Sequence, residues 1–91
     1  MFIPDFKIGD TGELFERGYH VKEAPANKKY PNPRFVFKGI EPGRDTMFYM
    51  FESVVGKYPY SVTELDFELK DCCFKVSGNI EKINRRRRNG W

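Results

Sequence analysis

The longest stretch with a single hydrophobic period runs from Ser61 to Ile83. Its apolar positions recur every three or four residues, at Val62, Leu65, Leu69, Cys72, Cys73, Val76, Ile80 and Ile83. At 100° per residue they fall within an arc of about 100°, the width of one buried stripe on an α-helix. Ser61 or Thr63 can cap the start of such a helix. The pattern therefore predicts a long C-terminal helix as the spine of the core.

The same stretch also fits short strands. Apolar and acidic residues alternate from Leu65 to Leu69, and Lys75 is flanked by Phe74 and Val76. The sequence Ser-Gly-Asn at 77–79 is typical of a hairpin turn, and a glycine inside a helix costs about 1 kcal/mol relative to alanine. A strand hairpin over residues 64–84 is therefore the alternative to the helix.

Shorter patterns predict the elements near the N-terminus. Residues 2–8 alternate in the manner of an extended segment or an edge strand, where Pro4 is tolerated. Asp10 or Thr11 would cap a short helix that ends at Arg17, before Gly18.

The middle of the chain predicts two strands and a second helix. The strands are Tyr19–Glu23 and Arg34–Ile40, joined by an exposed, proline-rich loop over residues 24–33. The helix runs from Thr46 to Lys57 and has an apolar face. Together these elements predict an α+β fold in which a small antiparallel sheet packs against two or three helices. Ninety-one residues suffice for one domain, expected over residues 1–84, with a basic, flexible tail over residues 85–91.

The positive charge of the chain is concentrated in that tail. The net charge is +3, and Arg85, Arg86, Arg87 and Arg88 contribute four positive charges, so the rest of the chain carries −1. Consecutive guanidinium groups can neutralise phosphates, and Trp91 could stack on an unpaired base. The alternatives are a solubilising terminus, or a cap on the negative end of the C-terminal helix.

Three further basic residues could extend this site. Lys28, Lys29 and Arg34 lie in or next to the proline-rich loop. If loop and tail converge in the fold, they would form one phosphate-binding face. Nucleic acid is therefore a candidate partner.

A protein partner or a homodimer is the competing expectation. Phe67 and Phe74 lie off the main stripe of the predicted C-terminal helix, so a helix with one buried face would expose them. Tyr49 and Tyr60 could extend this aromatic patch. The alternative is that the sheet and the helix over residues 46–57 cover both rings.

Enzyme chemistry has little support. The chain lacks a phosphate-binding glycine loop and a metal-spaced cluster, and His20 is its single histidine. Cys72 and Cys73 are adjacent, which strains a mutual disulfide, so both are expected to be reduced. A non-enzymatic protein without a cofactor is expected. No apolar run is long enough to span a membrane and no signal peptide is evident, so we expect a cytoplasmic protein.

The order of several residues resembles that of a known family. Asp10, Leu14 and Phe15 are followed by Gly18-Tyr19 at the start of a strand and by Arg34–Phe37, with two predicted helices after them. This order resembles a family of small phage and prophage proteins known only as a domain of unknown function. The long loop and the arginine tail depart from that family.

The resemblance implies a mobile element as the context, where small proteins often bind host macromolecules. It leads us to expect a phage-type protein that acts on a host nucleic acid or nucleoprotein complex in the host cytoplasm. The alternative is a protein-only inhibitor or adaptor of the anti-defence type, which would occlude a host enzyme through its aromatic surface.

Overall fold

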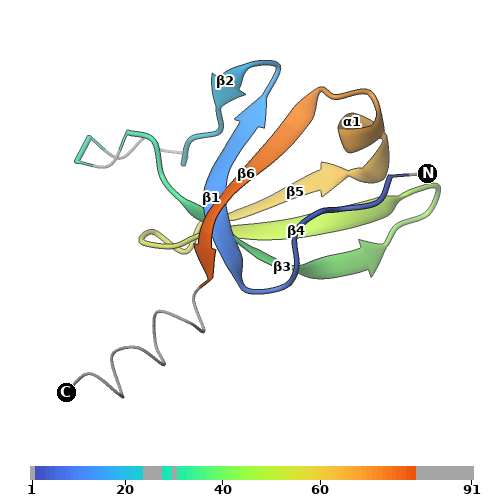
Figure 1. Ribbon diagram of the computed structural model, residues 1–91, viewed down its shortest axis with the longest axis horizontal. Helices are drawn as coiled ribbons and strands as arrows, with labels where there is room; N and C mark the ends of the chain where they lie inside the picture. Colours follow the sequence, from blue (N-terminus) through green and yellow to red (C-terminus); the bar gives the residue numbers. More distant parts are fainter. Residues whose placement is uncertain (1, 24–27, 30, 80–91) are drawn as a thin grey trace.

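Antiparallel strands make up most of the computed structural model, which describes residues 2–23, 28, 29 and 31–79. Within these residues there are six strands and one short helix (Figure 1). The strands are β1 (Asp10–Glu16), β2 (Tyr19–His20), β3 (Phe35–Pro42), β4 (Met47–Ser53), β5 (Pro59–Thr63) and β6 (Cys72–Asn79), and the helix is α1 (Glu64–Glu68).

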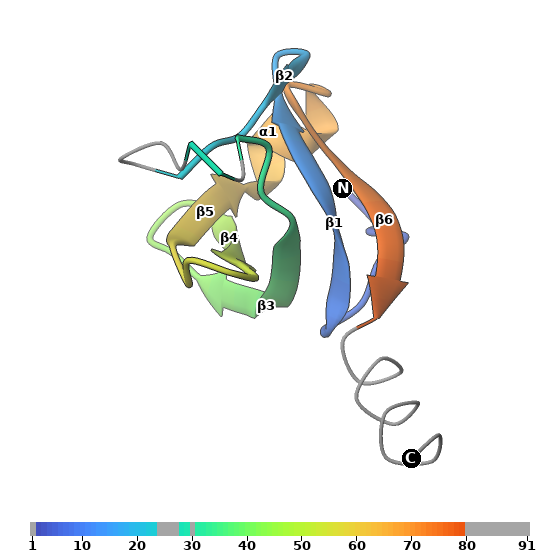
Figure 2. The ribbon, with the colours of Figure 1, turned by 90° about the vertical axis from the view of Figure 1, so that its left-hand side faces the viewer.

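The strands form one sheet in the order β2-β1-β3-β4-β5, with β6 paired to the other edge of β1. Along its first edge, β1 pairs with β3 at Thr11 and Gly12 and with β2 at Phe15 and Glu16. Because β1 changes partner along its length, the sheet curls into a half-barrel. Figure 2 shows β3, β4 and β5 as one wall, with β1 and β6 facing them.

A turn and a bulge shape the first strands. Arg17 and Gly18 both have positive φ, 52° and 84°, which matches a two-residue hairpin turn between β1 and β2. Thr11 pairs with Gly78 and Gly12 with Val76, so Ser77 is an extra residue that forms a bulge in β6, and bulges bend a strand and increase its twist.

The core inside the half-barrel is built mainly from aromatic rings. Each strand of the two walls turns alternate side chains inward, and the buried cluster contains Phe6, Leu14, Val21, Phe35, Phe37, Tyr49, Phe51, Val62, Phe67, Cys72 and Phe74. The N-terminal segment, residues 2–8, is extended but forms no strand, and it lies across the open side of the half-barrel. Its Phe6 ring packs edge-on against Phe37 at 4.9 Å and Phe74 at 5.2 Å, between ring centroids. Its Phe2 ring stacks on Phe67 at 4.7 Å.

The predicted C-terminal helix is wrong. Thr63 does cap a helix, with a capping box to Asp66, but α1 has only five residues. The chain then leaves the helix at Lys70, which has a positive φ of 61°, and continues as β6. Leu65 and Leu69 of the expected stripe are 54% and 62% exposed. The alternative of a strand hairpin over residues 64–84 was right only in that residues 72–79 form a strand. Residues 77–79 lie within this strand, β6, and not in a hairpin turn.

The other two predicted helices are strands as well. Residues 47–53 form β4, where pairing with β3 and β5 on both sides buries alternate side chains at Tyr49, Phe51 and Ser53. Residues 10–16 form β1. The α+β class is therefore wrong, and the described chain is mainly β. The strand predicted over Arg34–Ile40 is confirmed as β3, whereas the one over Tyr19–Glu23 is reduced to the two residues of β2.

The structure bears only in part on the expected absence of a membrane span and on the expected domain boundary. No helix in the described part of the chain is long and apolar enough to cross a membrane. The expected boundary between the domain and its tail, after residue 84, lies outside the described residues.

Candidate functional site

The basic residues predicted near the loop are on the surface. Lys28, Lys29 and Arg34 are all exposed, and they lie between β2 and β3. The four arginines of the tail and Trp91 lie outside the described residues, so the structure places none of them.

Arg34 connects three parts of the fold. Its guanidinium Nη2 donates a hydrogen bond to Oγ of Ser77 in β6, at 2.5 Å. Its carbonyl oxygen accepts a hydrogen bond from the backbone N–H of Val54, at 2.8 Å, in the turn between β4 and β5. Arg34 therefore joins the end of the loop to the β4–β5 turn and to the C-terminal part of β6.

These three segments lie on one side of the molecule. In Figure 1 residues 31–34 and the β4–β5 turn lie on the left, and the C-terminal end of β6 lies below them. The turn carries another exposed cation, Lys57. We call Lys28, Lys29, Arg34 and Lys57 the basic end. The sequence analysis did not include Lys57 because it placed this residue at the end of a predicted helix. Only the pairing of β4 with β5 shows that Lys57 lies in a turn between two strands.

An acidic side chain near the basic end is turned inward. Glu23 accepts a hydrogen bond from Ser53 Oγ at 3.2 Å, and its carboxylate lies against Gly56, where a Cβ atom would be 1.7 Å from Glu23 Oε2. Ser53 Oγ also accepts the backbone N–H of Tyr58 at 2.8 Å. Glu23 therefore helps to hold the β4–β5 turn that carries Lys57.

The aromatic residues predicted to bind a partner are mostly buried. Phe67 is 5% exposed, Phe74 is 7% exposed and Tyr49 is 3% exposed. The expected exposure of Phe67 and Phe74 is therefore wrong, because both rings point into the half-barrel and pack against the N-terminal segment. Burial, and then the nearby carboxylates of Glu64 and Glu68, raise the pKa of Tyr49.

Tyr60 differs from these three residues because it is only half-buried. Its hydroxyl donates a hydrogen bond to the Glu16 carboxylate. Burial and then this hydrogen bond raise the pKa of Tyr60. Tyr60 therefore stays protonated and joins β5 to the end of β1.

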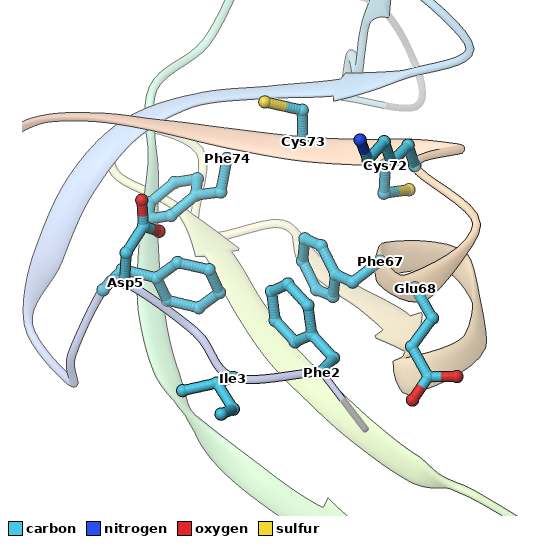
Figure 3. A pocket seen from close by; sticks show the side chains of 10 residues that line it. Phe2, Ile3, Asp5, Phe67, Glu68, Cys72, Cys73 and Phe74 are labelled. Carbon is cyan, nitrogen blue, oxygen red and sulfur yellow. The ribbon is translucent and has the colours of Figure 1, made fainter.

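The structure contains a groove that the sequence analysis did not predict. It has a volume of about 640 Å³ and lies between residues 2–6 and the start of β6, with α1 at one end (Figure 3). Its lining combines aromatic rings with a few polar groups, namely Phe2, Ile3, Asp5, Phe6, Phe67, Glu68, Lys70, Cys72, Cys73 and Phe74. We call it the aromatic groove. The sequence analysis placed residues 61–83 on one long helix, so it did not anticipate a groove between the N-terminal segment and a strand.

The reactive side chains of the described residues include two cysteines and one histidine. Both cysteines are free, with Cys72 buried and Cys73 exposed. Burial, followed by the charge of Glu16, raises the pKa of the Cys72 thiol to about 12, so it is not a thiolate at neutral pH. Nδ1 of His20 lies 3.9 Å from Oε2 of Glu13, and the His20 ring packs on Phe15. In the described part of the chain, no group of three His, Cys, Asp or Glu residues could hold a metal ion.

Comparisons with protein-family models, with curated proteins and with solved structures gave no match. The resemblance to small phage proteins therefore stays a prediction, and the candidate sites depend on their own geometry.

Proposed function

We propose that this protein is a small, non-enzymatic nucleic-acid-binding protein of the phage or mobile-element type, which engages the phosphate backbone of a host nucleic acid or nucleoprotein through its basic end. The observation that carries the proposal is the hydrogen bond between Arg34 and Ser77. It joins the segment next to Lys28 and Lys29 to the part of β6 from which the chain continues toward the arginine tail.

Chain connectivity supports a single binding surface. Arg85 follows Asn79, the last residue of β6, by six positions. An extended chain spans at most about 3.6 Å per residue, so Arg85 lies within roughly 22 Å of Asn79 in any conformation. The tail can therefore reach the phosphates that the basic end contacts, and a single nucleic acid can engage both.

The charge distribution favours phosphate as the ligand. Without residues 85–88 the chain carries a net charge of −1, so the positive charges matter through their clustering rather than through their total. Arginine presents a planar fork of donors that matches a phosphate group, and several such contacts give an affinity that falls steeply with salt.

The alternative inhibitor function has lost its supporting residues. It depended on exposed rings at Phe67 and Phe74, and both rings are buried.

Fluorescence anisotropy with a labelled 20-nucleotide single-stranded DNA and the matching duplex tests the proposal. Replacing Arg85 to Arg88 with alanine should weaken binding and lower the slope of log K against log salt by roughly 3.6 on the duplex, since each of the four lost phosphate contacts removes about 0.9. Arg34→Ala should lower the same slope by about 1.

Arg44→Ala is the matched control. Arg44 is exposed and belongs to the β3–β4 turn, on the side of the molecule opposite the basic end (Figure 1). It should bind both DNAs like the parent protein, with an unchanged salt slope. Equal behaviour of the Arg34 and Arg44 variants would exclude the basic end, and a parental salt slope for the tail variant would exclude the tail.

A further inference from the structure

The β4–β5 turn carries an aromatic side chain beside one of the cations of the basic end. β4 and β5 pair as far as Glu52 and Pro59, and beyond this pair the N–H of Ser53 donates to the carbonyl oxygen of Tyr58 at 2.8 Å. Opposed residues of two antiparallel strands direct their side chains to the same face of the sheet. Ser53 is fully buried on the inner face. Tyr58 therefore lies on that face at the rim of the half-barrel, next to Lys57 in the chain.

The Tyr58 ring stands apart from the aromatic core. It is only half-buried and is not a member of the core cluster, whereas Tyr60, two residues further along, packs against that cluster. Among the described residues, the Tyr58 ring contacts no other ring and its hydroxyl has no hydrogen-bond partner. In a molecule whose other inward-facing rings pack on one another, this ring is therefore available to a ligand.

Hydrogen bonds hold the backbone of the β4–β5 turn in one geometry. The N–H of Tyr58 donates to Ser53 Oγ at 2.8 Å, and the N–H of Lys57 donates to the carbonyl oxygen of Ser53 at 3.0 Å. Ser53 Oγ in turn donates to the Glu23 carboxylate at 3.2 Å. The aromatic ring and the cation are thus presented from a backbone that is already ordered, which lowers the entropy lost when a ligand binds.

The charges around Tyr58 favour an anionic ligand. Lys57 is exposed beside it, and Arg34 is a second exposed cation, whose carbonyl oxygen is hydrogen-bonded to the backbone of the same turn. Glu23 is held beneath the turn, where one of its carboxylate oxygens accepts a hydrogen bond and the other is buried. Glu52 lies on the opposite face of β4, because its neighbours in the strand point inward. A nucleic acid can therefore reach the ring and both cations without approaching an exposed carboxylate on this face of the turn.

We propose that the basic end binds single-stranded nucleic acid, with an unpaired base stacked on the Tyr58 ring and neighbouring phosphates on Lys57 and Arg34. This inference rests on the nucleic-acid-binding function proposed above and names the form of nucleic acid that the site takes. In a duplex the face of each base is covered by its neighbours, so contact with the phosphates leaves the ring unused. In a single strand each base has a free face, and stacking on an aromatic side chain strengthens binding by about fivefold or more. Stacking accepts any base, so the selectivity is for an unpaired strand and not for a sequence.

Three fluorescein-labelled probes of equal length separate stacking from charge. They are a strand of 20 thymidines, an abasic strand with the same number of phosphates, and a duplex of 20 base pairs. Fluorescence anisotropy at one salt concentration measures binding of the full chain to each. The parent protein should bind the thymidine strand at least about fivefold more tightly than the abasic strand, because only the former has bases to stack.

Two substitutions of Tyr58 test the role of its ring. Tyr58→Leu should weaken binding of the thymidine strand by about fivefold or more and leave binding of the abasic strand and of the duplex unchanged. The slope of log K against log salt should also stay parental, because no phosphate contact is lost. Tyr58→Phe keeps the ring and should bind all three probes like the parent. Tyr19→Leu is the matched control, since Tyr19 is 79% exposed but belongs to β2, at the top of Figure 1, and not to the basic end. It should bind like the parent as well.

The outcomes distinguish this site from the broader function. Parental binding of the thymidine strand by the Tyr58→Leu variant would overturn the stacking site, whereas salt-dependent binding of the duplex by the parent would leave the nucleic-acid-binding function standing. An equal loss on the thymidine and abasic strands would overturn the stacking site too, because it would show that the substitution disturbs the cations. So would a loss in the Tyr58→Phe variant as large as that in Tyr58→Leu, which would assign the contact to the hydroxyl. A parent protein that binds none of the three probes would overturn both proposals.

Discussion

Gly12 of β1 lies beside the bulge in β6, where the backbone of β6 passes close by. A Cβ atom at this position would be 2.0 Å from the carbonyl oxygen of Lys75 and 2.9 Å from Cα of Val76. Both contacts are with backbone, which cannot rotate away. The glycine is therefore required by the approach of two strands.

Gly12→Ala should consequently lower the free energy of unfolding by about 1 to 3 kcal/mol or more, as overpacking does in a core. Urea denaturation measures the change. Gly18→Asn is the control, since Gly18 has nothing within 4 Å and its positive φ of 84° is tolerated by asparagine. It should lower stability less than Gly12→Ala does, because only the backbone conformation and no close contact opposes it. Equal effects of the two substitutions would contradict the close approach.

Which single residues could be predicted depended on their chemistry. The exposure of Lys28, Lys29 and Arg34 was predictable because charged side chains in a proline-rich loop stay in water. The burial of Phe67 and Phe74 was not, because the face on which a ring lies depends on whether the backbone repeats every 3.6 residues or every two.

At the scale of elements, the stretch from residue 61 to residue 79 shows how a helical period can arise from other structures. Val62 belongs to β5, Leu65 to α1, and Cys72 and Val76 to β6. Their spacing of three and four residues results from joining a strand, one turn of helix and another strand. The cap at Thr63 was predictable from local chemistry, whereas the end of the helix was not. The end of the helix depends on the positive φ of Lys70 and on the pairing of β6 with β1. A pattern of about ten residues cannot reveal a strand partner that is more than 50 residues away in the sequence.

The short helix predicts different roles for Phe67, which lies within it, and Leu69, which caps its C-terminus. Phe67 is 5% exposed and stacks on Phe2, whereas Leu69 is 62% exposed. Phe67→Ala should cost about 3 to 5 kcal/mol of unfolding free energy, and Leu69→Ala less than about 1 kcal/mol. Chemical denaturation of both variants under the same conditions tests this. A larger loss for the Leu69 variant would restore the long helix and contradict the fold.

At the scale of the whole molecule, a half-barrel must fill its interior from a single curled sheet. The chain does so with aromatic rings, and the N-terminal segment adds Phe2 and Phe6 from the open side. The abundance of aromatic residues was evident from the sequence. The fold class was not, since β1 meets β6 only through contacts between distant parts of the chain, and local periodicity carries no information about such pairings.

The same packing predicts how the stability of the molecule depends on alkali. Burial raises the pKa of the Cys72 thiol from an ordinary value of 9.0 to about 12, and it also raises the pKa values of Tyr49 and Tyr60. Between about pH 9 and pH 12 the unfolded chain releases the Cys72 proton, whereas the folded chain keeps it. Deprotonation therefore favours unfolding, and stability should fall as the pH rises through this window while staying insensitive to these groups below about pH 9.

Urea denaturation at pH 7, 9, 10 and 11 measures this dependence, and two cysteine variants separate its sources. Cys72→Ala should be less stable than the parent at pH 7, because it leaves a small cavity in the core, but its stability should decline less between pH 9 and pH 11. Some decline should remain, since the two tyrosines still release their protons more readily in the unfolded chain. Cys73→Ala removes an exposed thiol and should be about as stable as the parent at pH 7. Parallel curves for the Cys72 variant and the parent would show that the Cys72 thiol is not held protonated by the fold, and would contradict its place in the core.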